Sequence, residues 1–222
     1  MQAMDRNKHT HNRRSLSVWK RAVLFVIAGV VLFLSIRIEP LGSQDQQDTV
    51  FDVAAYVDAF FADSLVERID AAPEVCTLID ELSLATEDEW AVMGNQVAIG
   101  SKYCFLTRGN GIVARVDTDA VVLRLAGSDG PRNVRVATEY VFGNEVRDAS
   151  GMIRLEDFDD LTVFNQLSEV INERIRTQVL PTFVNSVEVR DSVFVAGACC
   201  MNTRLRDMED IELIPIELNI YR

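Results

Sequence analysis

The residue types that usually perform catalysis are scarce beyond residue 49. Both histidines, His9 and His11, lie near the N-terminus, and Lys102 is the only lysine after residue 49. A Ser-His-Asp triad, a Cys-His nucleophile and a His-ligated zinc or iron site are therefore excluded from that part of the chain. The sequence also lacks a Walker A motif and a G-x-G-x-x-G that opens a helix. We therefore expect neither an enzyme nor a cofactor.

Carboxylates are the main chemical resource that remains. Glu156, Asp157, Asp159 and Asp160 cluster just before an expected helix. Such hard oxygen ligands suit Ca²⁺, but their spacing does not match an EF-hand loop, so we predict no metal site. The alternative is a solvated turn with acids that cap the helix. Two carboxylates would suffice for glycoside hydrolysis, although no particular pair stands out among so many acids.

One arginine stands at a position suited to ligand binding. Arg147-Asp148 follows an expected strand and a Gly143-Asn144 turn. An arginine at the exit of a strand can bind a carboxylate or a phosphate, whereas a structural Arg–Asp pair that holds the turn is the alternative. We predict Arg147, Asp148 and Asp157 as ligand-contacting residues and assign no catalytic residue. Trp90 is the only tryptophan after residue 19, which gives little direct support for a sugar-stacking groove.

Four cysteines, Cys76, Cys104, Cys199 and Cys200, leave three disulfide connectivities open. Outside the cytoplasm they can pair, and Cys76–Cys104 is the bond that we consider. Cys199 and Cys200 are adjacent on an expected strand, so their side chains point to opposite faces. The alternative is that both are buried as small apolar residues.

The N-terminal part of the chain has the pattern of a signal anchor. Residues 1–21 contain six basic residues and one acidic residue, and residues 22–38 are almost entirely apolar. This length approaches the roughly 20 residues that span a bilayer. The basic flank predicts a cytoplasmic tail and a single-pass inner-membrane protein whose remaining part is periplasmic or extracellular. A buried core helix and a cleaved signal peptide are the alternatives, but no A-x-A site follows.

The remainder of the chain is strongly acidic. Of the chain's 22 basic and 34 acidic residues, 16 and 33 lie after residue 21, which gives that part a net charge of −17. This charge excludes nucleic acid and anionic lipid headgroups as partners. Residues 39–49 are polar and predict a linker, so residues 50–222 form the expected extracytoplasmic domain.

Residues 50–98 read as mainly helical. Apolar residues recur every three or four positions over Val50–Ile69, with Thr49 or Asp48 as the N-cap, and a second helix is expected over Glu74–Leu84. Residues 87–96 are ambiguous between helix and loop.

From Lys102 the apolar period changes to two, which indicates strands. Arg108–Gly111 contains Asn-Gly, a strong hairpin signal. Before the last two strands the pattern predicts one long helix, Thr162–Leu180, that Pro181 stops. Pro215 predicts a free side on the last strand. The expected strands are Lys102–Thr107, Ile112–Val116, Val121–Leu125, Val134–Phe142, Ser192–Ala198 and Ile214–Ile220, the last with its four alternate apolar residues on one face.

This order predicts an α+β protein. Residues 102–222 fit a small OB-like β-barrel with one long helix inserted before the last two strands. The alternative is an open α+β sheet, because periodicity alone does not separate the two.

The part after residue 49 resembles a family of predicted periplasmic lipoproteins, the domain of unknown function 2291. Tyr56-Val57 in the first helix fits the opening of that family, and an ordered series of motifs follows over roughly residues 50–222. The matching stretches are Phe105–Val116, Val134–Asp148, Met152–Phe164, Asn172–Arg174 with Val179–Pro181, and the closing IELIPIELNI.

The resemblance implies an extracytoplasmic, membrane-tethered bacterial protein. Members often occur near sugar ABC-transport components, so it implies an accessory role in solute uptake with such a component or a small solute as partner. It brings no catalytic residues. The chain departs from the family in using a spanning segment where relatives carry a lipid on cysteine, and in having Phe142 where the family tends to place Gly-Pro. We therefore expect a non-enzymatic binding module; a carboxylate-based glycan hydrolase and a purely structural envelope protein are the alternatives.

Overall fold

The structure, a computed structural model, describes Val23 and residues 51–96, 100–128, 130–205 and 208–221. The chain divides into two units, and the second, Val50–Arg222, is described below. The expected cytoplasmic tail, spanning segment and linker lie outside the described residues except for Val23. Within the described ranges, no helix is both long enough and apolar enough to cross a bilayer.

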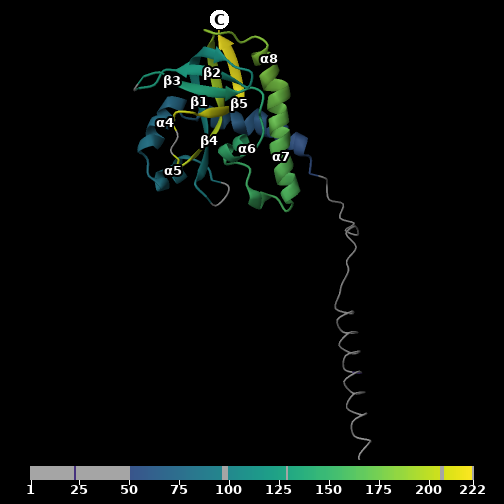
Figure 1. Cartoon of the computed structure of the whole chain (residues 1–222). Coiled ribbons are helices and arrows are strands. Elements are labelled where there is room, and N and C mark those ends of the chain that lie inside the picture. Colours follow the sequence, from purple (N-terminus) through teal and green to yellow (C-terminus); the bar gives the residue numbers. More distant parts are fainter. Residues whose placement is uncertain (1–22, 24–50, 97–99, 129, 206–207, 222) are drawn as a thin grey trace, which may run out of the picture. The chain divides into compact units, whose positions relative to one another are not determined.

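Five strands form a closed barrel in the order β1-β2-β3-β5-β4 (Figure 1). Neighbouring strands are antiparallel except β3 and β5, which are parallel. The expected barrel is thus confirmed over the open sheet. The strands are β1 (Lys102–Val116), β2 (Ala120–Leu125), β3 (Arg132–Ala137), β4 (Ser192–Asn202) and β5 (Glu212–Tyr221).

The hairpin predicted at Asn110-Gly111 is wrong, because β1 is one continuous strand of 15 residues. Its first part pairs with β4 and its last part with β2, and Gly111 pairs with both. The glycines serve close packing rather than a turn. A Cβ on Gly109 would lie 2.7 Å from the Leu125 side chain, and one on Gly111 would lie 3.0 Å from the backbone oxygen of Arg124.

The inner core fills the barrel and continues into two helices, α4 (Val75–Leu84) and α5 (Glu87–Met93). Helix α4 confirms the expected second helix, and α5 resolves the ambiguous segment. Thr86 and Glu89 form a reciprocal capping box at the start of α5. The Trp90 ring is fully buried, packs edge-on against Phe105 at 5.7 Å and donates from Nε1 to the Leu82 carbonyl. It is therefore a core residue and no platform for a sugar.

The first expected helix is confirmed from residue 53 as a helical run of α2 (Val53–Ala59), the π-helix η1 (Phe60–Ser64) and α3 (Leu65–Asp70). The N-cap is Asp52, not Thr49 or Asp48: its side chain accepts from the Ala55 amide at 3.0 Å. Val57, Phe60, Leu65 and Ile69 belong to a second cluster of buried apolar residues, which we call the outer core.

A second run of helices lies along one side of the barrel (Figure 1). It comprises α7 (Leu161–Arg174), the π-helix η3 (Ile175–Val179) and α8 (Leu180–Val184). The prediction that Pro181 stops the helix is wrong. Pro181 lies in the first turn of α8, where its missing N–H costs little, and the wider π-helical turn before it leaves room for its ring.

Between β3 and α7 the chain forms the short helix α6 (Glu145–Ser150) and the 3₁₀-helix η2 (Leu155–Asp157). The predicted strand Val134–Phe142 ends at Ala137, so Tyr140 and Phe142 lie in the β3–α6 connection. Helices α2, α3, α6 and α7 cover the outward sides of β1, β4 and β5 and form the outer core with them.

The four alternate apolar residues of β5 do not share one face. The β4–β5 register shifts between Ala196 and Gly197. Ile214 and Ile216 belong to the outer core, whereas Leu218 contacts both cores and Ile220 contacts the inner one. The bulge reverses the alternation, which a period of two does not reveal. Pro215 lies beyond the last β3–β5 pair, Val136 with Leu213, so β3 needs no hydrogen bond from it.

The predicted bond Cys76–Cys104 is wrong, because the disulfide joins Cys104 to Cys200. These residues are register partners on β1 and β4 with Cα atoms 4.0 Å apart. Cys76 instead lies on α4 in the inner core. Cys199 and Cys200 do point to opposite faces: Cys199 lies in the inner core as a free thiol, and Cys200 packs on the outer one. Burial raises the pKa of the Cys199 thiol to about 12, so it is inert at neutral pH.

Candidate functional site

A cavity of about 390 Å³ opens beside the disulfide, where β4 ends and α6 begins. Three segments far apart in the sequence meet there: the start of β1, the β3–α6 connection, and the end of β4 with the residues that lead into β5. Its lining residues are Lys102, Tyr140, Phe142, Glu145, Cys199, Cys200, Met201, Asn202, Leu205, Asp210, Ile211, Glu212 and Ile214. We call this space the disulfide cavity.

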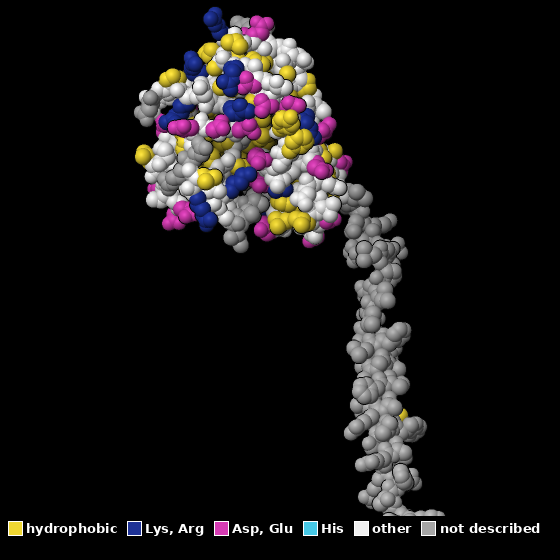
Figure 2. Space-filling view, viewed as in Figure 1, with side chains coloured by type: hydrophobic (Ala, Val, Ile, Leu, Met, Phe, Trp, Pro, Cys, Tyr) yellow, Lys and Arg dark blue, Asp and Glu magenta, His cyan; other side chains and the backbone are white. Residues whose placement is uncertain are grey.

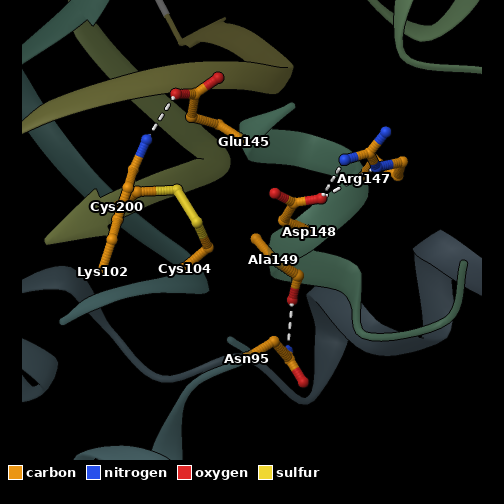
Figure 3. The surroundings of a disulfide bond; sticks show 8 residues. All are labelled: Asn95, Lys102, Cys104, Glu145, Arg147, Asp148, Ala149 and Cys200. Atoms are coloured by element: carbon orange, nitrogen blue, oxygen red, sulfur yellow. Dashed lines mark hydrogen bonds and ion pairs between the residues drawn. A yellow bond between two sulfur atoms is a disulfide. The ribbon is translucent and has the colours of Figure 1, made fainter. Parts of the chain in front are cut away.

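The single lysine of the domain forms an ion pair in the wall of this cavity. Lys102 is the first residue of β1, and its Nζ donates to Glu145 Oε1 on α6 at 3.2 Å (Figure 3). The Lys102 side chain is 60% exposed and that of Glu145 only 25%. An exposed pair of this kind contributes little to stability. Nζ therefore remains available to a ligand.

The second carboxylate oxygen of Glu145 is buried without a hydrogen-bond partner among the described residues. It lies against Gly143, whose φ is +89°; a Cβ there would be 2.3 Å from this oxygen. Glycine at 143 thus allows both the left-handed turn and the close approach of Glu145. The unpartnered oxygen leaves hydrogen-bonding capacity unused beside the cavity.

Two exposed aromatic rings stand at the same cavity. Tyr140 and Phe142 are each 62% exposed, although most of the large apolar side chains that the structure describes are buried. Arg176 of η3 lies 5.1 Å from the centre of the Phe142 ring and donates to the Val141 carbonyl, which supports the connection. Exposed rings beside polar groups are typical of sites that bind ligands with one apolar and one polar side.

Arg147 and Asp148, which the sequence singled out, lie together on α6. Arg147 is 3% exposed; Nε and Nη2 donate to Asp148 Oδ1 at 2.9 and 2.8 Å, and Nη1 donates to the Phe164 carbonyl. Its guanidinium also lies 3.8 Å from the centre of the Phe164 ring. These contacts attach α6 to α7, which is the geometry of the structural Arg–Asp pair.

Asp148 has unusual electrostatics. Its carboxylate lies near the disulfide in Figure 3. Burial raises its pKa above the ordinary 3.8 and outweighs the hydrogen bond and charge of Arg147, which act in the opposite direction. The charge of Glu145 raises this pKa further, and that of Lys102 lowers it. Asp148 is therefore coupled to both members of the Lys102–Glu145 pair.

Asp157 lies apart from the Arg147–Asp148 pair. It is exposed on η2, where Oδ2 accepts from the Arg154 amide at 3.3 Å. Its neighbours Arg154, Leu155 and Glu156 line a separate cavity of about 290 Å³ together with Asn95 and Asp148. The structure thus places Asp148, but not Asp157, in contact with that space.

The acidic cluster before α7 does not converge on one point. Asp160 is the N-cap of α7 and accepts from the Thr162 amide at 2.7 Å, which holds its pKa below the ordinary value. Among the described residues, no group of three or more His, Cys, Asp or Glu side chains is arranged to hold a metal ion. Figure 2 shows acidic side chains spread over the visible face with basic ones between them.

Sequence reasoning missed most of the disulfide cavity. The alternating pattern predicts Tyr140 and Phe142 on one face of a half-buried strand. In the structure both residues instead lie in the β3–α6 connection, where their rings are exposed. Nothing in the sequence marked Glu145, because α6 was not predicted. Lys102 was noticeable only as the sole lysine after residue 49.

Comparison with known proteins agrees with this architecture. Residues 26–219 match the family described as "Predicted periplasmic lipoprotein (DUF2291)". The fold is similar to the crystal structure of an OB-fold protein from Thermotoga maritima, with a TM-score of 0.64 and 19% sequence identity over 77% of this chain and 99% of that one. No curated protein matches the sequence. At this identity the structural likeness concerns the fold alone.

Proposed function

The chain belongs to the DUF2291 family of predicted periplasmic lipoproteins, and on this premise we propose that it is a membrane-anchored, non-enzymatic binding module that takes a small, uncharged, hydroxyl-rich solute, a sugar, into the disulfide cavity. In this proposal the module serves solute uptake, with a sugar ABC-transport component as its partner and residues 22–38 as its anchor in the inner membrane.

One observation carries the proposal: two exposed aromatic rings and a Lys–Glu ion pair line the same cavity of about 390 Å³. A sugar ring has apolar C–H faces that pack on aromatic rings and hydroxyl edges that both donate and accept hydrogen bonds. Tyr140 and Phe142 offer the first kind of contact, and Lys102, Glu145 and Asn202 offer the second. The volume lies within the roughly 300–1,000 Å³ of small-molecule sites.

The charges favour an uncharged solute over an anionic one. Among the described residues of the lining, Lys102 is the only basic one and is paired with Glu145, whereas Asp210 and Glu212 add two further acids. A sugar acid or sugar phosphate would face this excess of negative charge at close range.

The disulfide supports an extracytoplasmic position for the domain. Disulfide bonds such as Cys104–Cys200 persist in oxidising compartments and are rare in the cytosol. The family description and the apolar segment after a basic tail favour the same side of the membrane.

The hydrolase alternative has less support from the geometry. Of the three carboxylates in the described lining of the disulfide cavity, Glu145 is paired with Lys102 and Glu212 with Arg135, so only Asp210 has no ion pair among the described residues. Hydrolysis of a glycoside needs one free acid and one free base or nucleophile on either side of the bond.

The test is thermal unfolding of the full chain in a detergent without a sugar headgroup, with glucose, galactose, mannose, N-acetylglucosamine, their disaccharides and matched sugar acids. A ligand at 100 times its Kd adds about 2.7 kcal/mol, which raises Tm by roughly 5–10 °C for a domain of this size. We expect such a shift with an uncharged sugar and little with its acid.

Variants then assign the binding to the cavity. Tyr140→Ala is expected to weaken binding by about 1 kcal/mol or more, measured by calorimetry. Tyr221→Ala is the matched control, since Tyr221 is 55% exposed at the end of β5 and does not line the cavity. No shift with any sugar, or equal losses in the two variants, would refute the proposal.

A further inference from the structure

A second and larger cavity meets the disulfide cavity at Phe142, which lines both. This groove measures about 670 Å³ and runs between the β3–α6 connection and the exposed side of α7. Because Phe142 is 62% exposed, its ring is a shared wall rather than a closed partition. The two spaces together offer more room than a single sugar ring needs.

The groove repeats the chemistry of the disulfide cavity. Three amide side chains, Asn144, Asn165 and Asn172, and two carboxylates, Glu169 and Glu173, line it. Amides both donate and accept hydrogen bonds, as hydroxyl groups require. Arg176, the only basic residue in the lining as far as the structure describes it, already bonds Glu173 at 2.8 Å and the Val141 carbonyl, so the groove also favours an uncharged ligand.

One buried polar group in this lining is unsatisfied. The Ser168 side chain is 5% exposed, and its hydroxyl has no hydrogen-bond partner among the described residues. A helical serine commonly bonds the carbonyl four residues earlier; here that carbonyl, of Phe164, accepts from Arg147. Asn172, one turn further along α7, is in contrast fixed by its bond to the Gly143 carbonyl at 2.8 Å. The buried Ser168 hydroxyl can therefore form a hydrogen bond with a ligand in the groove.

We infer that the two cavities are successive subsites of one cleft that binds an oligosaccharide of at least two rings, with Phe142 between adjacent rings. This inference rests on the proposed sugar-binding function and adds the length of the ligand and its direction across the molecule, from the end of β4 to α7. Arg176 keeps the Phe142 ring in place by stacking on it while bonding the backbone of the same connection.

The test compares ligands of increasing length on the full chain by calorimetry. The series are glucose, maltose and maltotriose; glucose, cellobiose and cellotriose; and N-acetylglucosamine with its β-1,4-linked dimer and trimer. In one series the disaccharide is expected to bind about tenfold or more tighter than its monosaccharide, because only the longer ligand reaches the groove.

Blocking variants separate the groove from the disulfide cavity. Asn165→Trp fills the groove and is expected to remove the gain of the longer ligand while the monosaccharide still binds. Gln166→Trp is the matched control, since Gln166 is exposed on the same helix and lies outside the lining. Asn165→Ala, which removes the amide without adding bulk, serves if the tryptophan variant does not fold.

The outcomes distinguish the two proposals. Binding of a monosaccharide with no gain for longer ligands, or a gain that both Asn165 variants leave intact, overturns the two-subsite cleft and leaves the proposed function standing. Absence of binding to every saccharide overturns both.

Discussion

The two cores of this domain lie on opposite sides of the same strands and differ in what they bury. β4 contributes to both: Val193, Val195 and Cys199 face the inner core, and Ala196 and Ala198 face the outer one. The inner core is a cluster of apolar side chains. Six polar or charged side chains are buried in the described part of the domain, and four of them, Arg147, Ser150, Ser168 and Asn172, lie on α6 and α7, which cover the outer core.

This difference in buried polar groups indicates that the inner core mainly provides stability, whereas α6 and α7 also position the walls of the two cavities. An apolar core is stabilised mainly by the burial of its side chains, whereas buried polar groups cost free energy unless each is bonded. On the outer side these groups fix α6 and α7 beside the two cavities. If this division holds, substitutions in the inner core, in the outer core and in the cavity wall should differ in their effects on stability.

Phe105→Ala is expected to lower the free energy of unfolding by about 3–5 kcal/mol, because it opens a cavity under Trp90 in the inner core. Phe105 is 2% exposed. Phe142→Ala is the control, since that ring is exposed and its loss should change stability by less than about 0.5 kcal/mol. Urea unfolding measures both; similar losses would erase the distinction between the core and the cavity wall.

Arg147→Met is expected to cost about 3 kcal/mol, since it leaves Asp148 largely buried without its partner. The double variant Arg147→Met/Asp148→Asn should recover part of this loss, because no unpaired charge remains. Arg124→Met, at an exposed position on β2, controls for loss of a surface guanidinium. A single variant as stable as that control would show that the outer core does not depend on this pair.

Removal of the disulfide by Cys104→Ser/Cys200→Ser is expected to cost about 2–4 kcal/mol, since the bond closes a loop between residues 96 positions apart. Reductant should lower the Tm of the unmodified chain and leave that of the double variant unchanged. If the unmodified chain keeps its Tm under reductant while free-thiol titration shows the bond broken, the disulfide contributes nothing to stability.

Replacement by alanine of two serines on the helices that cover the outer core should affect the free energy of unfolding differently. Ser150 bonds the Arg147 carbonyl at 2.6 Å, so Ser150→Ala is expected to cost about 1 kcal/mol. Ser168 has no such bond, so Ser168→Ala is expected to leave stability unchanged or raise it by up to about 1 kcal/mol. Equal losses in chemical denaturation would indicate that the Ser168 hydroxyl is bonded in the ligand-free protein.

The pH dependence gives the smallest effect. Burial raises the pKa of Asp148, so between its ordinary value of 3.8 and the raised value the folded protein holds a proton that the unfolded chain has lost. The free energy of unfolding should therefore decrease as pH rises through this window and show no further contribution from Asp148 above it. Urea midpoints of the unmodified chain and of Asp148→Asn should diverge there; parallel curves would remove Asp148 as the cause.

The sequence predicted those features that local patterns determine. Apolar periodicity located α4, α7 and most of every strand, and the order of elements indicated the barrel. Errors arose where partners distant in sequence decide the outcome. Asn110-Gly111 has a turn signal, but close packing against β2 requires small residues within a strand. The partner of Cys104 depends on a β1–β4 register that no local pattern encodes.

The site was harder to predict than the fold for the same physical reason. The disulfide cavity takes Lys102, Tyr140, Glu145 and Asn202 from segments that meet only after the barrel closes. Arg147 and Asp148 were visible as an adjacent pair, but their burial under Phe164 depends on how α7 packs on α6.

The Cys104–Cys200 bond also bears on how the protein matures. Cys76 precedes both members of this bond in the chain, and Cys199 lies between them; both of these cysteines are free thiols. When a chain crosses a membrane from its N-terminus, Cys76 and Cys104 emerge together, long before Cys200. An oxidant that joins cysteines in their order of arrival would form a Cys76–Cys104 bond, which the folded domain does not contain. Maturation in the envelope therefore requires either that oxidation wait for β4 to pair with β1, or that an isomerase correct the first bond.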